Sequence, residues 1–185
     1  LVSIGFQSEN FYYTPRIDKQ LLRQYSNGLI ACSACLGGEL PKAVMNYNSL
    51  NANGSFREPL DLRAAEEVVS EFFEIFGEDY YLEMQNHGHP EQKLVNKAIK
   101  ILSEKYNIPY IATNDVHFVN KFDFEAHKIL LCINTGKDYT NPDSAVQESD
   151  TDNGLLYTGE EYLKTREEMI QLFEEYPDAI TNTQL

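Results

Sequence analysis

Short apolar runs alternate along this chain with stretches of helical periodicity, and the connections between them are short. Three runs have the length of buried strands, at 28–34, 79–85 and 109–113. Amphipathic stretches lie between them, at 39–47, 61–76 and 90–106. Such alternation favours parallel strands joined by helical crossovers, either in an open α/β sheet or in part of a barrel. Because a closed barrel needs more strands than these, we expect a portion of one.

Local signals predict the remaining elements. Pro15 suits the first turn of a helix over 15–27, which Gly28 would end. Asp61 is expected to be the N-cap of the helix that ends at Gly77. Less regular signals predict a surface insertion over 46–60, a helix over 121–133, an exposed polar segment over 136–153, a short strand over 155–157 and a last helix over 160–176.

The balance of charges limits the partners. Asp and Glu total 29 and Lys and Arg total 15, so the formal net charge is −14. A surface of this kind does not favour the phosphate backbone of nucleic acid, which needs clustered cations. Apolar runs also fall short of the roughly 20 residues that a membrane helix needs. The composition predicts a cytoplasmic domain that binds metals, small anions or other proteins.

The segment Thr113-Asn114-Asp115-Val116-His117 closes the third predicted strand. Side chains at i and i+2 of a strand point to the same face, so Asp115 and His117 should converge. Functional side chains of parallel α/β folds sit at the carboxyl ends of strands. A carboxylate and an imidazole there would form half of a zinc or manganese site. The alternative is a capping Asp and a hydrogen-bonded His without a ligand.

Cys35 also follows a predicted strand, before the Gly37-Gly38 turn. Alone it would be a small buried hydrophobe. Together with Asp115 and His117 it would complete a sulfur, oxygen and nitrogen donor set that favours zinc. Cys32, within the strand, and Cys132, in an apolar helix stripe, are interpreted as structural.

Several polar side chains have two readings. Glu83 and Gln85 share one face of the strand 79–85, which is either the polar mouth of a site or a solvated side. His87 and His89 flank a glycine in a turn and are read as solvated loop residues. His127 lies mid-helix beside acidic residues and is expected to cover an exposed face.

Long segments of the chain resemble the PHP (polymerase and histidinol phosphatase) domain of bacterial DNA polymerase III alpha subunits. The matching segments follow the order of that family over nearly the whole chain. They are FYYTPRIDKQLL at 11–22, GLIACSACLGGELP at 28–41, DYYLEMQNHGHPEQKLVNKAIKIL at 79–102, YNIPYIATNDVHFVNKFDFEAHKILLCINTGK at 106–137 and EEMIQLFEEYPDAITNT at 167–183.

The resemblance implies a distorted seven-stranded, TIM-like barrel that holds up to three metal ions, usually zinc, with manganese or magnesium as alternatives. Cys35, Asp115 and His117 match ligand positions of the family. We expect Glu83, His87 and Asn114 to contact these ligand side chains without binding the metal themselves. Related domains are phosphoesterases or 3′–5′ exonucleases; others are scaffolds that dock a separate proofreading exonuclease subunit. A stand-alone phosphatase acting on a small phosphate ester is a third possibility.

The sequence also departs from the family. Its opening HxH motif and the intermediate His, Glu and His ligands are absent, and so is the acidic triad of the polymerase palm. We therefore expect residues 1–160 to be the later part of a PHP domain and 161–185 to lead toward the polymerase region of a parent DNA-directed DNA polymerase, a nucleotidyltransferase. DNA would be bound by other domains of that parent. The isolated piece is expected to be inactive, to bind metal weakly and to self-associate.

Overall fold

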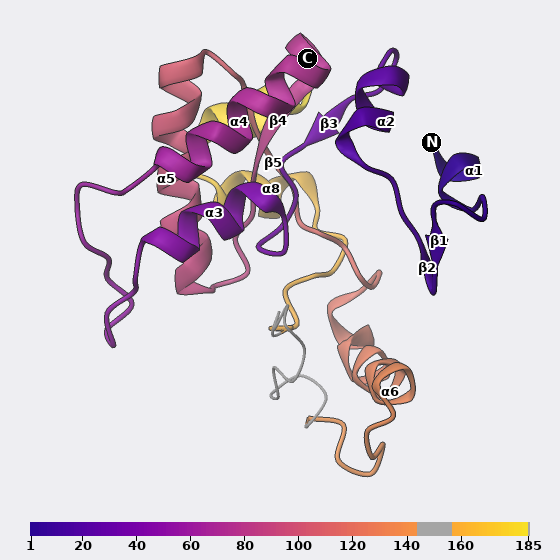
Figure 1. Cartoon of the computed structure of the whole chain (residues 1–185). Helices are drawn as coiled ribbons and strands as arrows, with labels where there is room; N and C mark the ends of the chain where they lie inside the picture. Colours follow the sequence, from indigo (N-terminus) through magenta and orange to yellow (C-terminus); the bar gives the residue numbers. More distant parts are fainter. Residues whose placement is uncertain (144–156, 185) are drawn as a thin grey trace.

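A three-stranded parallel sheet lies at the centre of the chain (Figure 1). The computed structural model describes residues 1–143 and 157–184. The strands β3 (Ala31–Cys32), β4 (Tyr80–Met84) and β5 (Tyr110–Ala112) lie in that order. Ala31 is paired with Tyr80, and Leu82 with Tyr110. The mixed α/β class and the parallel pairing predicted from the alternating pattern are confirmed, whereas the seven-stranded barrel stays a prediction.

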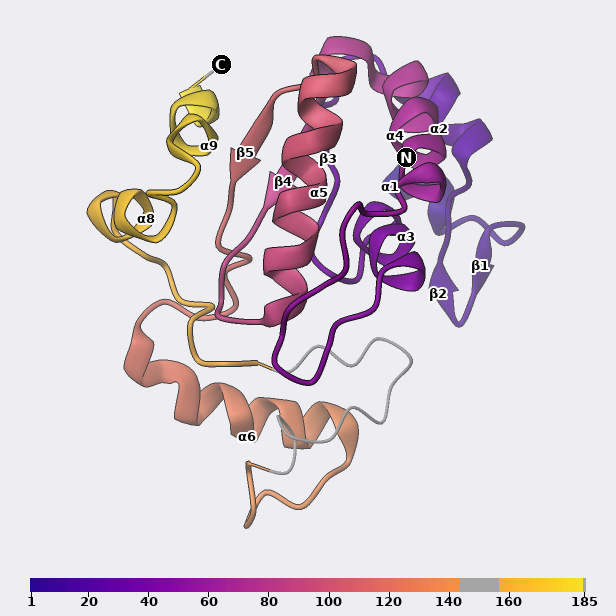
Figure 2. The same ribbon diagram turned by 90° about the vertical axis from the view of Figure 1, so that its left-hand side faces the viewer.

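Helical crossovers join the strands. The helices α3 (Glu39–Tyr47) and α4 (Arg63–Phe76), with the 3-10 turn η1 (Gly77–Asp79), lead from β3 to β4. The helix α5 (Pro90–Tyr106) leads from β4 to β5 and packs across the strands (Figure 2). Alternate residues of β4 point into this layer, so Tyr80, Leu82 and Met84 are buried. Helix side chains form the other wall of this core, and they include Leu40, Val44, Val69, Leu94, Ala98, Ile99 and Leu102.

The predicted helix over 15–27 is wrong at its start. Residues Phe11–Tyr12 (β1) and Thr14–Pro15 (β2) form a short antiparallel hairpin after α1 (Val2–Gly5). Helix α2 covers only Lys19–Tyr25, because the Asp18 carboxylate accepts a hydrogen bond from the Leu21 N–H at 2.8 Å and begins the helix there. The strand predicted over 28–34 is also shorter in the structure, because only the residues of β3 pair with a neighbouring strand, β4.

Asp61 is not the N-cap of α4. Leu62 holds that position, and the Asp61 carboxylate, one residue earlier, accepts from the Arg63 N–H at 3.3 Å and binds the Arg63 guanidinium at 2.7 Å. Asp61 is placed by Asn48, whose amide accepts from the Asp61 N–H and donates to its carbonyl oxygen. Asn48 therefore closes the base of the mostly exposed segment 49–59, which is the larger part of the predicted insertion.

The C-terminal part is less helical than predicted. After η2 (Lys121–Asp123) and α6 (Phe124–Thr135), the next described helix is α8 (Arg166–Leu172), not one that begins at residue 160. A capping box between Thr165 and Glu168 begins α8 there, and the extended residue Tyr162 pairs with Phe118. The chain then forms α9 (Pro177–Thr181), which packs on β5, and η3 (Asn182–Gln184). The strand predicted over 155–157 lies mainly outside the described residues.

The helices within residues 1–143 and 157–184 are too short or too polar to cross a bilayer.

The packing predicts a large cost for truncating the central strand. Leu82 is fully buried between β5 and the helices, so Leu82→Ala should lower the free energy of unfolding by about 2–5 kcal/mol. Ile133→Ala, at a side chain that is 70% exposed, should change it by less than about 0.5 kcal/mol. Urea denaturation of both variants checks this, and equal losses would contradict the packing described.

Candidate functional site

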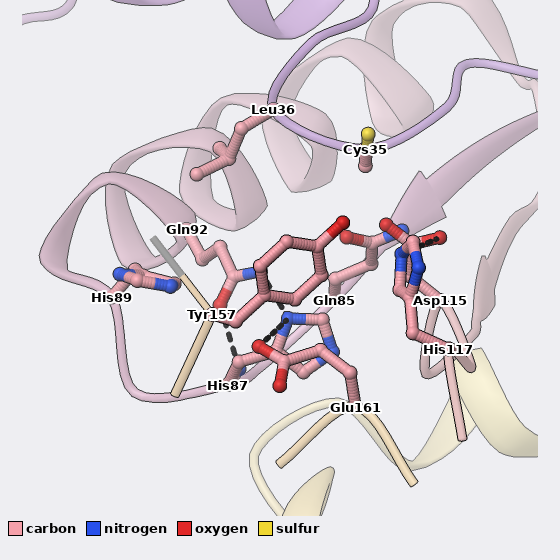
Figure 3. A pocket seen from close by; sticks show the side chains of 10 residues that line it. All are labelled: Cys35, Leu36, Gln85, His87, His89, Gln92, Asp115, His117, Tyr157 and Glu161. Carbon is pink, nitrogen blue, oxygen red and sulfur yellow. Dashed lines mark hydrogen bonds and ion pairs between the residues drawn. The ribbon is translucent and has the colours of Figure 1, made fainter. Parts of the chain in front are cut away.

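The loops that follow β3, β4 and β5 meet at one edge of the sheet around a small cavity of about 30 Å³ (Figure 3). Cys35 comes from the loop after β3, and Gln85 and His87 come from the loop after β4. Asp115 and His117 come from the loop after β5. The parallel register brings these three loops together, since it places all three carboxyl ends at the same edge.

Asp115 and His117 lie side by side, with Asp115 Oδ1 3.5 Å from His117 Nε2. Strand alternation is not the cause, because β5 ends at Ala112. Instead, Asp115 has a φ of +39°, in the left-handed region that Asp tolerates better than most residues. The sharp turn there directs both side chains into the cavity. The predicted proximity is thus present for a different reason from the one expected.

Cys35 faces the same cavity from the opposite loop (Figure 3). Its turn depends on Gly38, because a Cβ there would lie 2.5 Å from the Ser33 carbonyl oxygen. Burial raises the pKa of the Cys35 thiol, the Gly37 backbone opposes this, and the Asp115 carboxylate raises it further. The thiol beside Asp115 is therefore protonated near neutral pH, and a cation bound between them would favour the thiolate.

His87 is buried, so its reading as a solvated loop residue is wrong. Its Nδ1 lies 3.0 Å from Gln92 Nε2, and its Nε2 lies 3.1 Å from the Asn114 carbonyl oxygen. Burial lowers the pKa of His87, against the opposing effect of the Glu161 carboxylate, whose Oε1 is 4.0 Å from Nδ1. His87 thus joins the end of β4 to the residue before Asp115. Its predicted role in supporting metal ligands stays a prediction.

Asn114 connects the site to the segment 158–163. Its Nδ2 donates to the carbonyl oxygens of Glu160 at 2.8 Å and Tyr162 at 2.7 Å. The His117 N–H donates to the Glu161 carbonyl at 2.8 Å. The same segment is stiffened by the buried Glu161 carboxylate, which accepts hydrogen bonds from Thr158 and Gly159. Asn114 thus holds the loop of Asp115 and His117 against this segment. Its support of metal ligands stays a prediction.

Glu161 was missed by sequence reasoning, because residues 160–176 were read as one helix. The signal that could have found it is the Thr158-Gly159 pair, which suits a turn closed by a carboxylate.

Two aromatic rings contact the partly exposed side chain of His117. The rings of Tyr157 and His127 both stand edge-on or tilted against it, with centroids 4.9 and 5.8 Å away. The prediction that His127 covers an exposed face is wrong, because its ring packs against His117, Phe118 and Tyr157. Its Nε2 is buried and has no hydrogen-bond partner among the described residues. Burial and the neighbouring His117 lower the pKa of His127.

Glu83 supports the floor of the site. Its Oε1 accepts hydrogen bonds from the Thr113 hydroxyl and from Gln85 Nε2, so it ties β4 to the loop after β5. Gln85 is buried at the cavity wall, which favours the polar-mouth reading of this face. Of the other cysteines, Cys132 is buried in α6 and Cys32 is exposed.

Within residues 1–143 and 157–184, no three His, Cys, Asp or Glu side chains are grouped closely enough to hold a metal ion by themselves. Cys35, Asp115 and His117 line one cavity, and their role as ligands stays a prediction.

Comparison with known proteins identifies the family of this chain. The model of the PHP domain matches residues 1–87. The chain carries a PHP domain. This PHP chain is 39% identical over 183 residues to the DNA polymerase III subunit alpha of Borreliella burgdorferi, covering 99% of the chain and 14% of that relative.

Two further relatives carry the same name. Identity is 39% over 161 residues with the Thermus aquaticus protein, covering 87% of the PHP chain and 11% of that relative. It is 38% over 177 residues with the Treponema pallidum protein, covering 95% and 13%. The PHP chain thus spans between 11% and 14% of the length of these relatives.

The buried His87 predicts a specific pH dependence of stability. Its pKa is below the ordinary value of 6.5, so on acidification the unfolded chain takes up this proton before the folded chain does. The free energy of unfolding should therefore fall as the pH drops through 6.5 and level off below the folded pKa. In His87→Gln this part of the decrease should disappear. Urea denaturation from about pH 8 to about pH 5.5 checks it, and identical pH profiles would contradict the burial of a neutral His87.

Proposed function

We propose that this chain is part of a replicative DNA polymerase of the DNA polymerase III alpha type, and that its cavity is one part of a metal-dependent phosphoesterase site. The observation that carries the proposal is the meeting of a thiol, a carboxylate and an imidazole at the carboxyl edge of the sheet. These groups come from three loops far apart in the sequence, at Cys35, Asp115 and His117. The likeness to DNA polymerase III alpha subunits supports the parent's identity.

The donor set fits zinc better than magnesium. Thiolate and imidazole ligands suit zinc, whereas magnesium takes oxygen ligands and manganese is intermediate. When bound, such an ion supplies Lewis-acid activation of water and of a phosphodiester, which is 3′–5′ exonuclease chemistry if the substrate is a DNA end. The remaining ligands would come from the HxH motif and the other ligand positions of the family, which this sequence lacks.

The chain's own residues prepare the site. The Asp115 carboxylate lies 3.5 Å from His117 Nε2, so it would form an ion pair with that imidazole when the ring is protonated. The Glu161 carbonyl fixes the backbone of His117, and Tyr157 and His127 shield one side of the ring from water. Cys35 would have to release its proton to bind a metal. DNA would be bound by other domains of the parent protein, because the net charge here is −14.

The phosphoesterase proposal predicts the effect of removing each ligand. In the full-length parent protein, Asp115→Ala and His117→Ala should each lower metal-dependent hydrolysis of a 3′ DNA end by at least about 100-fold, since even outer contacts of metal ligands are worth 10–100-fold. Asp138→Ala is the matched control, because it removes an exposed carboxylate outside the cavity. Zinc content and exonuclease rate are measured together.

Unchanged hydrolysis in both cavity variants would contradict the phosphoesterase role. Metal bound by the wild type without hydrolysis would instead support a structural brace.

A scaffold role is the second candidate, and a separate surface favours it. Helix α6 stands away from the sheet (Figures 1 and 2) and exposes apolar side chains at helical spacing. Ile129, Leu130 and Ile133 are each more than 40% exposed. Apolar stripes of this kind mark protein interfaces. We propose that this face docks a proofreading exonuclease subunit of the replicative holoenzyme, and that in the isolated chain it promotes self-association.

The scaffold role predicts the effect of one charge on α6. Ile133→Asp in the full-length protein should weaken binding of the exonuclease subunit by at least about tenfold, through loss of a buried apolar contact and burial of a charge. Asn134→Asp adds the same charge at the neighbouring exposed position and should have little effect. Calorimetric titration measures both; equal affinities would show that this face is not the docking surface.

A further inference from the structure

The peptide between Asn114 and Asp115 decides where the Asp115 carboxylate points. Its plane is set by ψ of Asn114 and φ of Asp115, and that φ is +39°. A non-glycine residue pays a conformational cost in this region, which surrounding contacts must offset. The Asn114 carbonyl oxygen lies 3.1 Å from His87 Nε2. A group that holds this oxygen therefore constrains the rotation that brings Asp115 beside His117.

Two backbone groups fix which nitrogen of His87 carries its proton. The His87 backbone N–H is a donor only, and it donates to Gln92 Oε1 at 2.6 Å. The other end of that amide is therefore the donor Nε2, and it faces His87 Nδ1 at 3.0 Å. Nδ1 must accept, so the proton is on Nε2, where the Asn114 carbonyl oxygen can only accept. With this tautomer, each donor in these three contacts faces an acceptor.

The side chain of Asn114 holds the same peptide from the other side. Both hydrogens of its amide are used, on the carbonyl oxygens of Glu160 and Tyr162. Its Oδ1 is buried without a partner among the described residues, so the amide nitrogen supplies the attachment. The Asn114–Asp115 peptide is thus held between β4, through His87, and the segment 158–163. These two attachments hold Asp115 in its left-handed conformation despite the conformational cost.

We propose that His87, as its neutral Nε2–H tautomer, is a positioning residue that holds the Asn114 carbonyl and thereby keeps Asp115 in its left-handed conformation beside His117. This positioning role depends on the proposed function only in the identity of the ligand that Asp115 binds. His87 touches neither substrate nor metal in this scheme. The conformation is a property of the folded chain and is measurable without either.

The tautomer is tested directly in the wild-type chain. Nitrogen-15 NMR of the imidazole should show a protonated Nε2 and an unprotonated Nδ1 at neutral pH. One-bond Cα–Hα coupling of Asp115 should have the value of a positive φ. A proton on Nδ1, or a negative φ at Asp115, would overturn the proposal.

Two variants separate the hydrogen bond from simple packing. His87→Gln keeps an amide N–H that can reach the Asn114 carbonyl, whereas His87→Leu fills similar space without a donor. In His87→Leu the His117 amide should exchange its hydrogen about tenfold faster relative to the core amide of Leu82, as expected for one lost buried hydrogen bond. His87→Gln should restore the wild-type ratio. Equal ratios in the two variants would overturn the proposal.

Asn48→Ala is the matched control for loss of stability. Asn48 is also a buried amide that bridges two segments, yet it lies at the base of the 49–59 segment. It should lower stability without changing the ratio of His117 to Leu82 exchange. Should His87→Leu fail to fold, the wild-type NMR measurements and His87→Gln still decide the question.

Zinc affinity then links the positioning role to the proposed function. In the full-length protein, His87→Leu should weaken zinc binding by about 10–100-fold, with recovery in His87→Gln. An unchanged zinc affinity in His87→Leu would overturn the positioning role. Wild-type protein that binds no zinc would contradict the proposed function alone, while the tautomer and the φ of Asp115 would still decide the positioning role.

Discussion

Strand β4 is paired in parallel with β3 on one side and with β5 on the other, and the site depends on this arrangement. Parallel pairing puts three carboxyl ends at one edge, so that loops separated by about 50 and 30 residues share a single cavity. The strands are short, and β3 contributes only Ala31 and Cys32. Their position is maintained by the buried layer beneath them, where Leu82 packs against α5 and its neighbours. The cavity therefore depends on the core, and loss of core packing would separate the three loops that line the cavity.

The loop after β5 shows how a locally unfavourable conformation is maintained. Asp115 adopts a left-handed φ, and the residues on both sides of it are tied to other segments, Asn114 to His87 and His117 to the Glu161 carbonyl. Each bond alone contributes about 1 kcal/mol, comparable to the cost of the strained residue. Together they contribute about 2 kcal/mol, which lies within the roughly 1–3 kcal/mol that such a conformation costs. Buried neutral His87 thus has a structural consequence at Asp115 that its place in a glycine-containing turn did not suggest.

Much of the fold was predictable because the apolar pattern of each element matches its surroundings. The parallel order of the strands and the helix bounds of α3 and α5 follow from periodicity and from Pro90. Periodicity could not show that Pro15 joins a hairpin, nor that a capping box begins α8 at Arg166, because those choices are made by hydrogen bonds with specific partners. The site was predictable only in part. Strand alternation predicts that Asp115 and His117 lie together, but β5 ends at Ala112. The position of Glu161 and the ring contacts of His127 depend on tertiary contacts that one sequence does not reveal.

We propose that Cys35, Asp115 and His117 each contribute a ligand to a metal site at the carboxyl edge of the sheet, which the other ligand positions of the family complete. Zinc K-edge X-ray absorption of the full-length, zinc-loaded protein tests this most directly, since a thiolate ligand is seen as a sulfur scatterer at about 2.3 Å. We expect one sulfur in a shell otherwise made of nitrogen and oxygen, and its replacement by oxygen or nitrogen in Cys35→Ser. A shell without sulfur in the wild type, or a sulfur that persists in Cys35→Ser, would contradict the claim.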